Sequence, residues 1–166
     1  MVRAYLGLGS NLGNREMNIQ RALRLLATHK TRVGAISPLY ETEPWGMIDQ
    51  PRFLNAVCAL DTNYPPHALL TTLKEIEATM GRIPSMRYGP RLIDLDILLY
   101  GDQLIDTPDL KIPHPEMLRR AFVLVPLATI APETIHPATN LTIAEHLCSA
   151  DISGIALYPP GLSNIT

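Results

Sequence analysis

The stretch GPRLIDLDILLYG (residues 89–101) combines the pattern of a buried β-strand with two acidic residues. Alternate residues from Ile93 to Leu99 are apolar and form one continuous face, as in a strand that packs on a core. Asp94 and Asp96 are two residues apart, so their side chains point together to the other face. Aspartate is disfavoured in strands, and a buried carboxylate is costly without a partner. The pair therefore indicates that a cation binds at this face of the strand.

The segments before this strand predict a fold of the α+β class. The order is strand, helix, two extended segments, helix and strand. This is the ferredoxin-like β-α-β-β-α-β arrangement, an antiparallel sheet with its helices on one face. The expected strands are residues 2–10, 32–42, 53–62 and 92–100, and the expected helices are residues 16–28 and 65–80. The 166 residues are enough for one domain with a real core.

Residues 101–166 are predicted to extend this single domain, which spans residues 1–166. The extension contains an apolar segment at 118–130 and a short helix at 142–149. Residues 157–166 are expected to be a flexible tail, as chain ends without a docking partner commonly are.

The glycines near the N-terminus resemble a dinucleotide-binding fingerprint, but they do not match its spacing. After Gly7 and Gly9, the third glycine of that pattern would fall at Leu12. We therefore interpret the glycines as turn residues, with Ser10 and Asn11 stabilising the turn through side-chain hydrogen bonds.

Composition excludes several classes of function. The net charge is -2, from 14 basic and 16 acidic residues, whereas general binders of nucleic acid or membrane surfaces are usually basic. The two cysteines, Cys58 and Cys148, show neither a disulfide framework nor metal-site spacing. We find no signal peptide and no apolar stretch long enough to span a bilayer. We expect a cytoplasmic monomer that binds neither nucleic acid nor membranes.

Basic residues surround the aspartate pair and favour a phosphate-rich ligand. Two hard oxygen ligands suit Mg²⁺, which completes its shell with water and substrate phosphates, and a pair of such ions clamps a polyphosphate. Arginine binds phosphate oxygens through planar, bidentate contacts. The candidates near the strand and after the IPHPE segment are Arg82, Arg87, Arg91, Arg119 and Arg120.

A second group of residues suits a flat heterocycle. Aromatic rings sandwich such a ligand, and an asparagine side chain offers it both a donor and an acceptor. The residues are Trp45, Phe53, Tyr88, Phe122 and Asn55. Core packing remains the alternative for Phe53 and Phe122, and His114 between two prolines is equally compatible with a plain surface position.

Five segments together resemble the 6-hydroxymethyl-7,8-dihydropterin pyrophosphokinase family. They are GLGSNLG, SPLYETEPWG, FLNAV, RYGPRLIDLDILLYG and IPHPEMLRRAFVLVPLATIAP. The likeness runs in order from about residue 4 to residue 133, and the GPRLIDLDILLYG block is highly specific. The resemblance implies transfer of the pyrophosphoryl group of ATP to the hydroxymethyl oxygen of the dihydropterin, with release of AMP, in folate biosynthesis.

The resemblance also implies roles for individual residues. Asp94 and Asp96 would bind two Mg²⁺ ions, while Arg82 and Arg91 would stabilise charge on the transferring phosphates. The positions matching nucleotide contacts are Lys74, Arg87, Ile97, Lys111, His114 and Arg120. The positions matching the pterin pocket are Thr42, Trp45, Phe53, Asn55, Tyr88 and Phe122. Glu77 would support the site from its helix. Pro84 departs from the family, because many relatives carry a second basic residue there, which removes one expected phosphate contact.

Two other classes of function remain open on the residues alone. A metal-dependent phosphohydrolase also uses paired aspartates, but it would release phosphate or pyrophosphate from ATP without any pterin. A non-catalytic ligand-sensing module could share the ferredoxin-like fold, since fold alone does not fix function. Such a module would bind ATP and pterin without forming AMP.

Overall fold

The computed structural model describes residues 1–43, 49–81 and 90–159. These residues form a six-stranded antiparallel sheet in the order β5-β1-β4-β3-β8, with β2 also paired to β4. Its strands are β1 (Val2–Ser10), β2 (Thr31–Ile36), β3 (Tyr40–Thr42), β4 (Phe53–Thr62), β5 (Asp94–Tyr100) and β8 (Ile155–Leu157). A short second sheet pairs β6 (Ile105–Asp106) with β7 (Lys111–Ile112).

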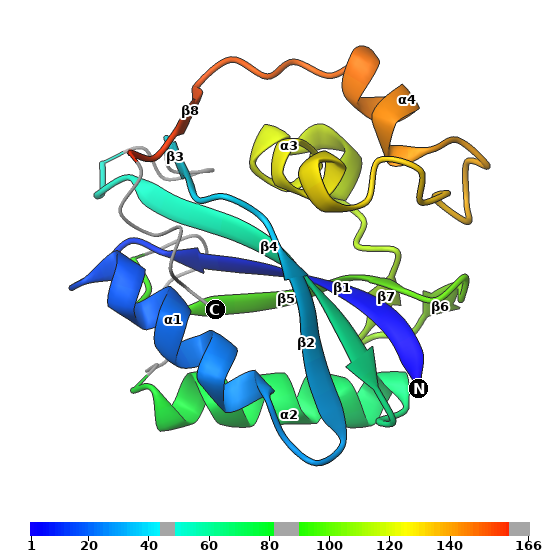
Figure 1. The fold of residues 1–166 in the computed structure, drawn as a ribbon, viewed down its shortest axis with the longest axis horizontal. Coiled ribbons are helices and arrows are strands. Elements are labelled where there is room, and N and C mark those ends of the chain that lie inside the picture. The colour runs from blue at the N-terminus through cyan, green and yellow to red at the C-terminus, as the bar shows by residue number, and fades with distance from the viewer. Residues whose placement is uncertain (44–48, 82–89, 160–166) are drawn as a thin grey trace.

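Two helices cover one face of the sheet, as the sequence predicts (Figure 1). They are α1 (Arg15–Leu26) and α2 (Pro66–Thr79). Asn14 caps α1, since its side-chain oxygen accepts from the Met17 backbone N–H at 3.1 Å. Pro66 suits the first turn of α2, where the missing N–H costs nothing. The order β1-α1-β2-β4-α2-β5 with antiparallel pairing is the predicted ferredoxin-like α+β fold.

The C-terminal extension adds a third layer. Helix α3 (Ala121–Ile130) lies on the opposite face of the sheet from α1 and α2 (Figure 1). Its Val123, Leu124 and Leu127 join Val57 and other buried residues in a second hydrophobic cluster. A 3₁₀ turn (Met117–Arg119) precedes α3, and the short helix α4 (Ile143–Cys148) follows it. The central strand β4 is therefore buried on both faces.

The extended segment 32–42 is two strands. β2 pairs with the C-terminal half of β4, and β3 pairs with the first three residues of β4. Both therefore lie along the same edge of β4. Between them, Ser37 N–H donates to Val57 O at 2.9 Å, and Ser37 Oγ accepts from Val57 N–H at 2.9 Å. Pro38 has no N–H to continue the ladder, which explains the break.

The predicted alternation along β5 fails at its far end. The pairing of β1 with β5 shifts between Tyr5, opposite Leu99, and Leu6, opposite Ile97, which leaves Leu98 as a bulge. Leu98 and Leu99 therefore both join the cluster under α3, whereas Tyr100 joins the cluster under α1 and α2. The prediction that Leu99 continues the Ile93–Ile97 face was wrong, because the bulge turns the Leu99 side chain to the opposite face of the sheet.

The chain near residue 157 is held by the sheet. β8 pairs with β3, and the Tyr158 N–H donates to Leu39 O at 2.9 Å. Residues 157 and 158, which we expected in a flexible tail, thus belong to the sheet edge, and residues 160–166 lie outside the described part. No helix among the described residues is long and apolar enough to cross a membrane.

Candidate active site

Two cavities open side by side where β5 begins. The first has a volume of about 410 Å³ and the second a volume of about 400 Å³. They share a boundary, which we call the junction. Its residues are Arg91, Asp94, Asp96, His114 and Pro115. A ligand in one cavity and a ligand in the other would meet at this charged junction.

Asp94 and Asp96 line both cavities, in keeping with their two-residue spacing. β1 lies beside them, with Gly9 opposite Asp94 and Gly7 opposite Asp96. Gly9 is also paired with Asn55 on β4, so it separates that amide from the carboxylates. The junction is therefore built across three neighbouring strands.

The interpretation of Gly7 and Gly9 as turn residues was wrong. Both lie inside β1 and line the floor of the first cavity. A Cβ added at Gly9 would lie 2.9 Å from Asn55 Oδ1, closer than real Cβ atoms approach. Glycine is required there because the backbone itself forms the cavity floor. The turn glycine of this segment is Gly13, which has a φ of 65°.

The positive charges at the junction do not fully compensate its buried carboxylates. Arg91 Nη1 donates to Asp94 Oδ1 at 3.0 Å. Burial raises the pKa of the Asp96 carboxyl, and the negative charge of Asp94 raises it further, against the opposing effects of Arg120 and Arg91. Arg91 Nε is buried without a hydrogen-bond partner among the described residues. The site therefore favours added positive charge beside the carboxylates and an added acceptor beside Arg91.

Glu77 supports the strand that carries the aspartates. Glu77 on α2 is 4% exposed, and its Oε2 accepts from the Leu95 backbone N–H at 3.1 Å. Glu77 also lines the second cavity. It fixes β5 at the residue between the two aspartates, which matches the supporting role expected for it.

The donor set at the junction fits Mg²⁺ bound together with a phosphate ligand. Among the described residues, no group of three or more His, Cys, Asp or Glu side chains is arranged to hold a metal alone. Mg²⁺ commonly uses one or two carboxylates, with water and substrate phosphates completing its shell. Asp94 and Asp96, on one face of a strand and open to two cavities, supply that minimal set.

His114 is neutral at physiological pH. Burial and the positive charge of Arg120 lower the pKa of His114 to about 4. Its Nδ1 accepts from the Glu116 backbone N–H at 3.1 Å, so the ring proton resides on Nε2. The ring thus offers a neutral donor at the junction, rather than a surface imidazole.

Four residues expected at a pterin pocket come together in the first cavity. They are Thr42, Phe53, Asn55 and Phe122. Asn55 is 6% exposed, and its Nδ2 donates to Thr42 Oγ1 at 2.8 Å. This bond orients the amide within a cavity that also presents two aromatic rings. The guanidinium of Arg120, another lining residue, lies 5.5 Å from the centroid of the Phe122 ring.

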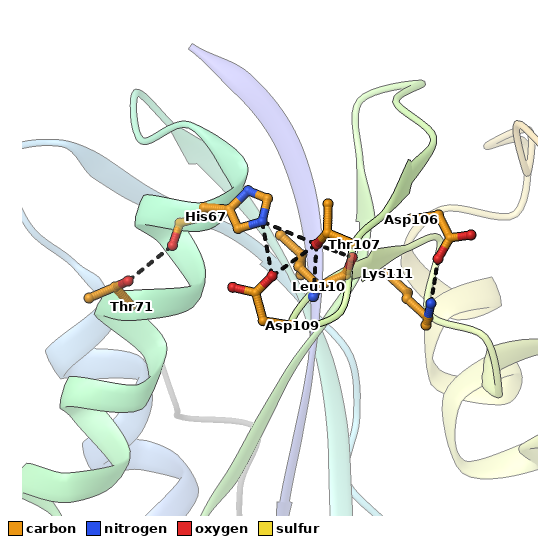
Figure 2. A network of polar contacts seen from close by, with 7 residues as sticks. All are labelled: His67, Thr71, Asp106, Thr107, Asp109, Leu110 and Lys111. Atoms are coloured by element: carbon orange, nitrogen blue, oxygen red, sulfur yellow. Dashed lines mark hydrogen bonds and ion pairs between the residues drawn. The ribbon is translucent and has the colours of Figure 1, made fainter.

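Four residues expected to contact the nucleotide line the second cavity. They are Lys74, Ile97, Lys111 and His114. Arg120, expected with them, lines the first cavity. The ammonium of Lys111 is paired with Asp106 on the other strand of the small sheet (Figure 2). The Lys111 ammonium has three donors, so it can contact a phosphate in addition to Asp106.

Four further predicted site residues, Trp45, Arg82, Arg87 and Tyr88, lie outside the described residues, as does Pro84. Their predicted roles stay predictions.

Sequence reasoning missed the role of Asn11. This side chain is 2% exposed, and its Oδ1 accepts from the Arg91 backbone N–H at 2.7 Å. Its Nδ2 donates to Pro51 O at 3.0 Å and to Gln50 Oε1 at 2.9 Å. Asn11 thus ties the segment that leads into β4 and the segment that leads into β5 to the end of β1. An asparagine after a strand predicts a local turn, and no sequence signal indicates partners 40 and 80 positions away.

Comparison with known proteins gives consistent matches. The family described as 7,8-dihydro-6-hydroxymethylpterin-pyrophosphokinase (HPPK) matches residues 5–132. A 2-amino-4-hydroxy-6-hydroxymethyldihydropteridine pyrophosphokinase of Pseudomonas aeruginosa is 48% identical over 95% of this chain and 97% of its own length. Folic acid synthesis protein fol1 of Schizosaccharomyces pombe is 46% identical over 93% of this chain, which spans 21% of that longer protein.

Solved structures share the fold at low sequence identity. A crystal structure of HPPK-DHPS in complex with substrates has a TM-score of 0.72 and 18% identity, covering 89% of this chain and 43% of that chain. Wild-type HPPK-DHPS of Plasmodium falciparum has a TM-score of 0.70 and 19% identity, covering 87% of this chain and 44% of that chain. This chain thus spans less than half of these structures.

Proposed function

The chain belongs to the 7,8-dihydro-6-hydroxymethylpterin-pyrophosphokinase family, and from this premise we propose that it transfers the pyrophosphoryl group of ATP to 6-hydroxymethyl-7,8-dihydropterin in folate biosynthesis. The acceptor is the hydroxymethyl oxygen, and AMP is the leaving group. The single observation that carries this proposal is the junction. It joins a cavity with aromatic and amide groups to a cavity with basic and apolar groups.

The first cavity suits the pterin. Asn55 is fixed at its inner end and offers a donor and an acceptor to the edge of a flat heterocycle. Phe53 and Phe122 supply flat apolar surface from two different elements. A ring bound between these groups would direct a substituent toward Gly9 and the aspartates beyond it.

The second cavity suits the nucleotide, with its phosphates at the junction. Arg91 offers a guanidinium that lines both cavities, and His114 offers a neutral N–H. Mg²⁺ held by Asp94 and Asp96 would neutralise phosphate charge when bound. Two such ions are in keeping with the family resemblance.

The residues at the junction act by position and charge. Bond formation between the pterin oxygen and the β-phosphorus requires both reactants to be aligned, and holding them aligned lowers the entropic cost of reaction. Arg91 stabilises charge that develops on the transferring group. Asn11 holds the Arg91 backbone, so it serves as a positioning residue for that guanidinium.

The test is AMP formation from ATP and Mg²⁺ with and without 6-hydroxymethyl-7,8-dihydropterin. AMP that appears only with the pterin supports the proposal. Phosphate or pyrophosphate released at the same rate without pterin would instead indicate a phosphohydrolase. Binding of both ligands without any AMP would indicate a ligand-sensing module.

We further propose that the enzyme acts as a monomer. Light scattering of the eluting protein at assay concentrations, with and without ligands, tests this point.

A further inference from the structure

A tight turn between β6 and β7 forms one wall of the second cavity. Thr107 N–H donates to Leu110 O at 3.0 Å, and Leu110 N–H donates to Thr107 Oγ1 at 3.2 Å. The wall carries Pro108, Asp109 and Leu110, all of which line the cavity. The geometry of this wall therefore depends on one threonine hydroxyl.

A second contact ties this wall to α2 on the other side of the cavity. Figure 2 shows His67 of α2 reaching across to Thr107 and Asp109. His67 Nε2 lies 3.2 Å from Thr107 Oγ1 and 3.4 Å from Asp109 Oδ1. Thr107 Oγ1 also lies 3.0 Å from Asp109 Oδ1. The side chains of Thr107 and His67 thus hold the Asp109 carboxylate in one place.

Asp109 is a charged acceptor at the rim. Hydrogen bonding from Thr107 lowers the pKa of its carboxyl, so it is ionised at neutral pH. Its side chain is 67% exposed, and a carboxylate has acceptor capacity beyond its contacts with Thr107 and His67. Asp109 lines the second cavity but not the junction. The negative charge of Asp109 would repel the phosphates of a nucleotide, whereas Arg91 at the junction would attract them. The phosphates are therefore expected at the junction and not beside Asp109.

The rest of this end of the cavity is apolar. Leu110 is 7% exposed and Ile97 is 4% exposed, so they suit the buried face of a nucleobase. A ribose lies between the base and the phosphates, and its hydroxyls are the polar groups that would remain at the rim. An ionised carboxylate fixed there has the chemistry to accept from them.

Resting on the proposed function, we propose that Asp109 accepts a hydrogen bond from a ribose hydroxyl of the ATP. Thr107 and His67 are the positioning residues that fix the carboxylate for this contact. The enzyme would then discriminate ribonucleotides from deoxyribonucleotides at the second cavity.

The test compares the affinities of ATP, 2′-deoxy-ATP and 3′-deoxy-ATP by calorimetry in Mg²⁺, without pterin. We expect the wild-type protein to bind ATP roughly tenfold or more tightly than at least one deoxy analogue, since hydrogen bonds to charged groups are strong. Asp109→Asn should bring that ratio close to one. Asp106→Asn is the matched control, because it removes the same charge from the same hairpin outside the cavity, and its ratio should match the wild-type ratio.

Equal affinities for the three nucleotides in the wild-type protein would overturn the proposal. So would an unchanged ratio in Asp109→Asn, or an equal loss in Asp106→Asn. The pterin-dependent AMP assay is independent of this ratio, so failure of the ribose contact and failure of the proposed function are told apart.

The positioning role has its own readout. Thr107→Val keeps the shape of the side chain but removes the hydroxyl, so the ratio of ATP to deoxy-ATP affinity should fall. Thr107→Ser restores the hydroxyl and should restore the ratio. A purely structural threonine would change the stability of the protein in both variants and leave the ratio unchanged, which would overturn the positioning role.

Discussion

Arginine and aspartate meet at both ends of the β1–β4 pair, with opposite results for the carboxylate. At the end remote from the cavities, Asp61 Oδ1 accepts from Arg3 Nε at 2.6 Å, and Asp61 Oδ2 accepts from Arg32 Nη2 at 2.9 Å. These bonds lower the pKa of Asp61 to about 2. At the other end, burial and Asp94 raise the pKa of Asp96.

The two ends are related by the register of the same strands. Arg3 is opposite Asp61, and six residues further along β1, Gly9 is opposite Asn55, which places the ends roughly 20 Å apart. At the remote end one carboxylate has two cations. At the junction the carboxylates of Asp94, Asp96 and the buried Glu77 share the positive charges of Arg91 and Arg120.

The difference separates a structural charge cluster from a functional one. A carboxylate that is already paired with cations in the free protein, as Asp61 is, has reached its favourable state. A cluster that burial leaves short of positive charge gains from a bound cation, and perturbed carboxylates in a cavity are candidates for function. Removing one carboxylate at each end, Asp96 at the junction and Asp61 at the remote end, tests this difference.

The largest effect is expected for Asp96→Ala. We expect turnover to fall by about 10³-fold or more, because removing a ligand at the junction removes charge stabilisation in the transition state. The Tm should stay equal or rise, because the lost carboxylate is destabilised by burial and by Asp94. Turnover and circular dichroism are the measurements, and near-normal turnover at ordinary Mg²⁺ would refute the metal assignment.

Arg91→Ala should lower kcat by about 10²-fold or more, with a smaller change in ATP affinity. That pattern is expected of a contact made mainly in the transition state. Single-turnover kinetics and ATP titration separate the two quantities. The control is Arg32→Ala at the remote end, which should leave kcat unchanged. If Arg91→Ala lost only ATP affinity, its guanidinium would be a docking contact.

Asn55→Ala should weaken pterin binding by about 10- to 100-fold and leave ATP binding nearly unchanged. The amide is fixed by Thr42 inside the first cavity, and its loss leaves polar groups of the pterin unpaired. Calorimetric titration of each ligand separately tests this. Equal losses for both ligands would indicate that Asn55 is structural.

The sequence predicts those features of the junction and of the fold that depend on residues close together in the chain. The spacing of Asp94 and Asp96 predicts a shared face because side chains alternate along any strand. The alternation of helix and strand patterns likewise predicts the order of the ferredoxin-like core. Both inferences need only residues close together in the chain.

Features that depend on distant partners could not be predicted. Asn11 acts through Arg91, 80 positions away, and local rules assign an asparagine there to a turn. The bulge at Leu98 arises from pairing with β1, and it reverses the sides of Leu99 and Tyr100. The segment at 118–130 is apolar on all sides, so its pattern does not specify which face of the sheet α3 covers.

The smallest effect is expected at the remote end, for Asp61→Asn. Because the folded-state pKa of Asp61 lies at about 2, below its usual value of 3.8, its ionised form stabilises the fold above about pH 4. That contribution is lost as the pH falls from 4 toward 2. Arg3 and Arg32 are at least half exposed, so solvent screening reduces the contribution to roughly 1 kcal/mol.

Urea unfolding of the wild-type protein and Asp61→Asn at pH 7, 4 and 2.5 measures this contribution as a difference. We expect the wild-type protein to be more stable at pH 7 and the difference to be clearly smaller at pH 2.5, close to the folded-state pKa. Other acidic groups titrate in both proteins and cancel in the difference. Turnover of the two proteins at pH 7 should match, because Asp61 lies far from the junction. A stability difference independent of pH would show that packing, rather than charge, makes Asp61 stabilising, and the contrast between the two ends would then not be electrostatic.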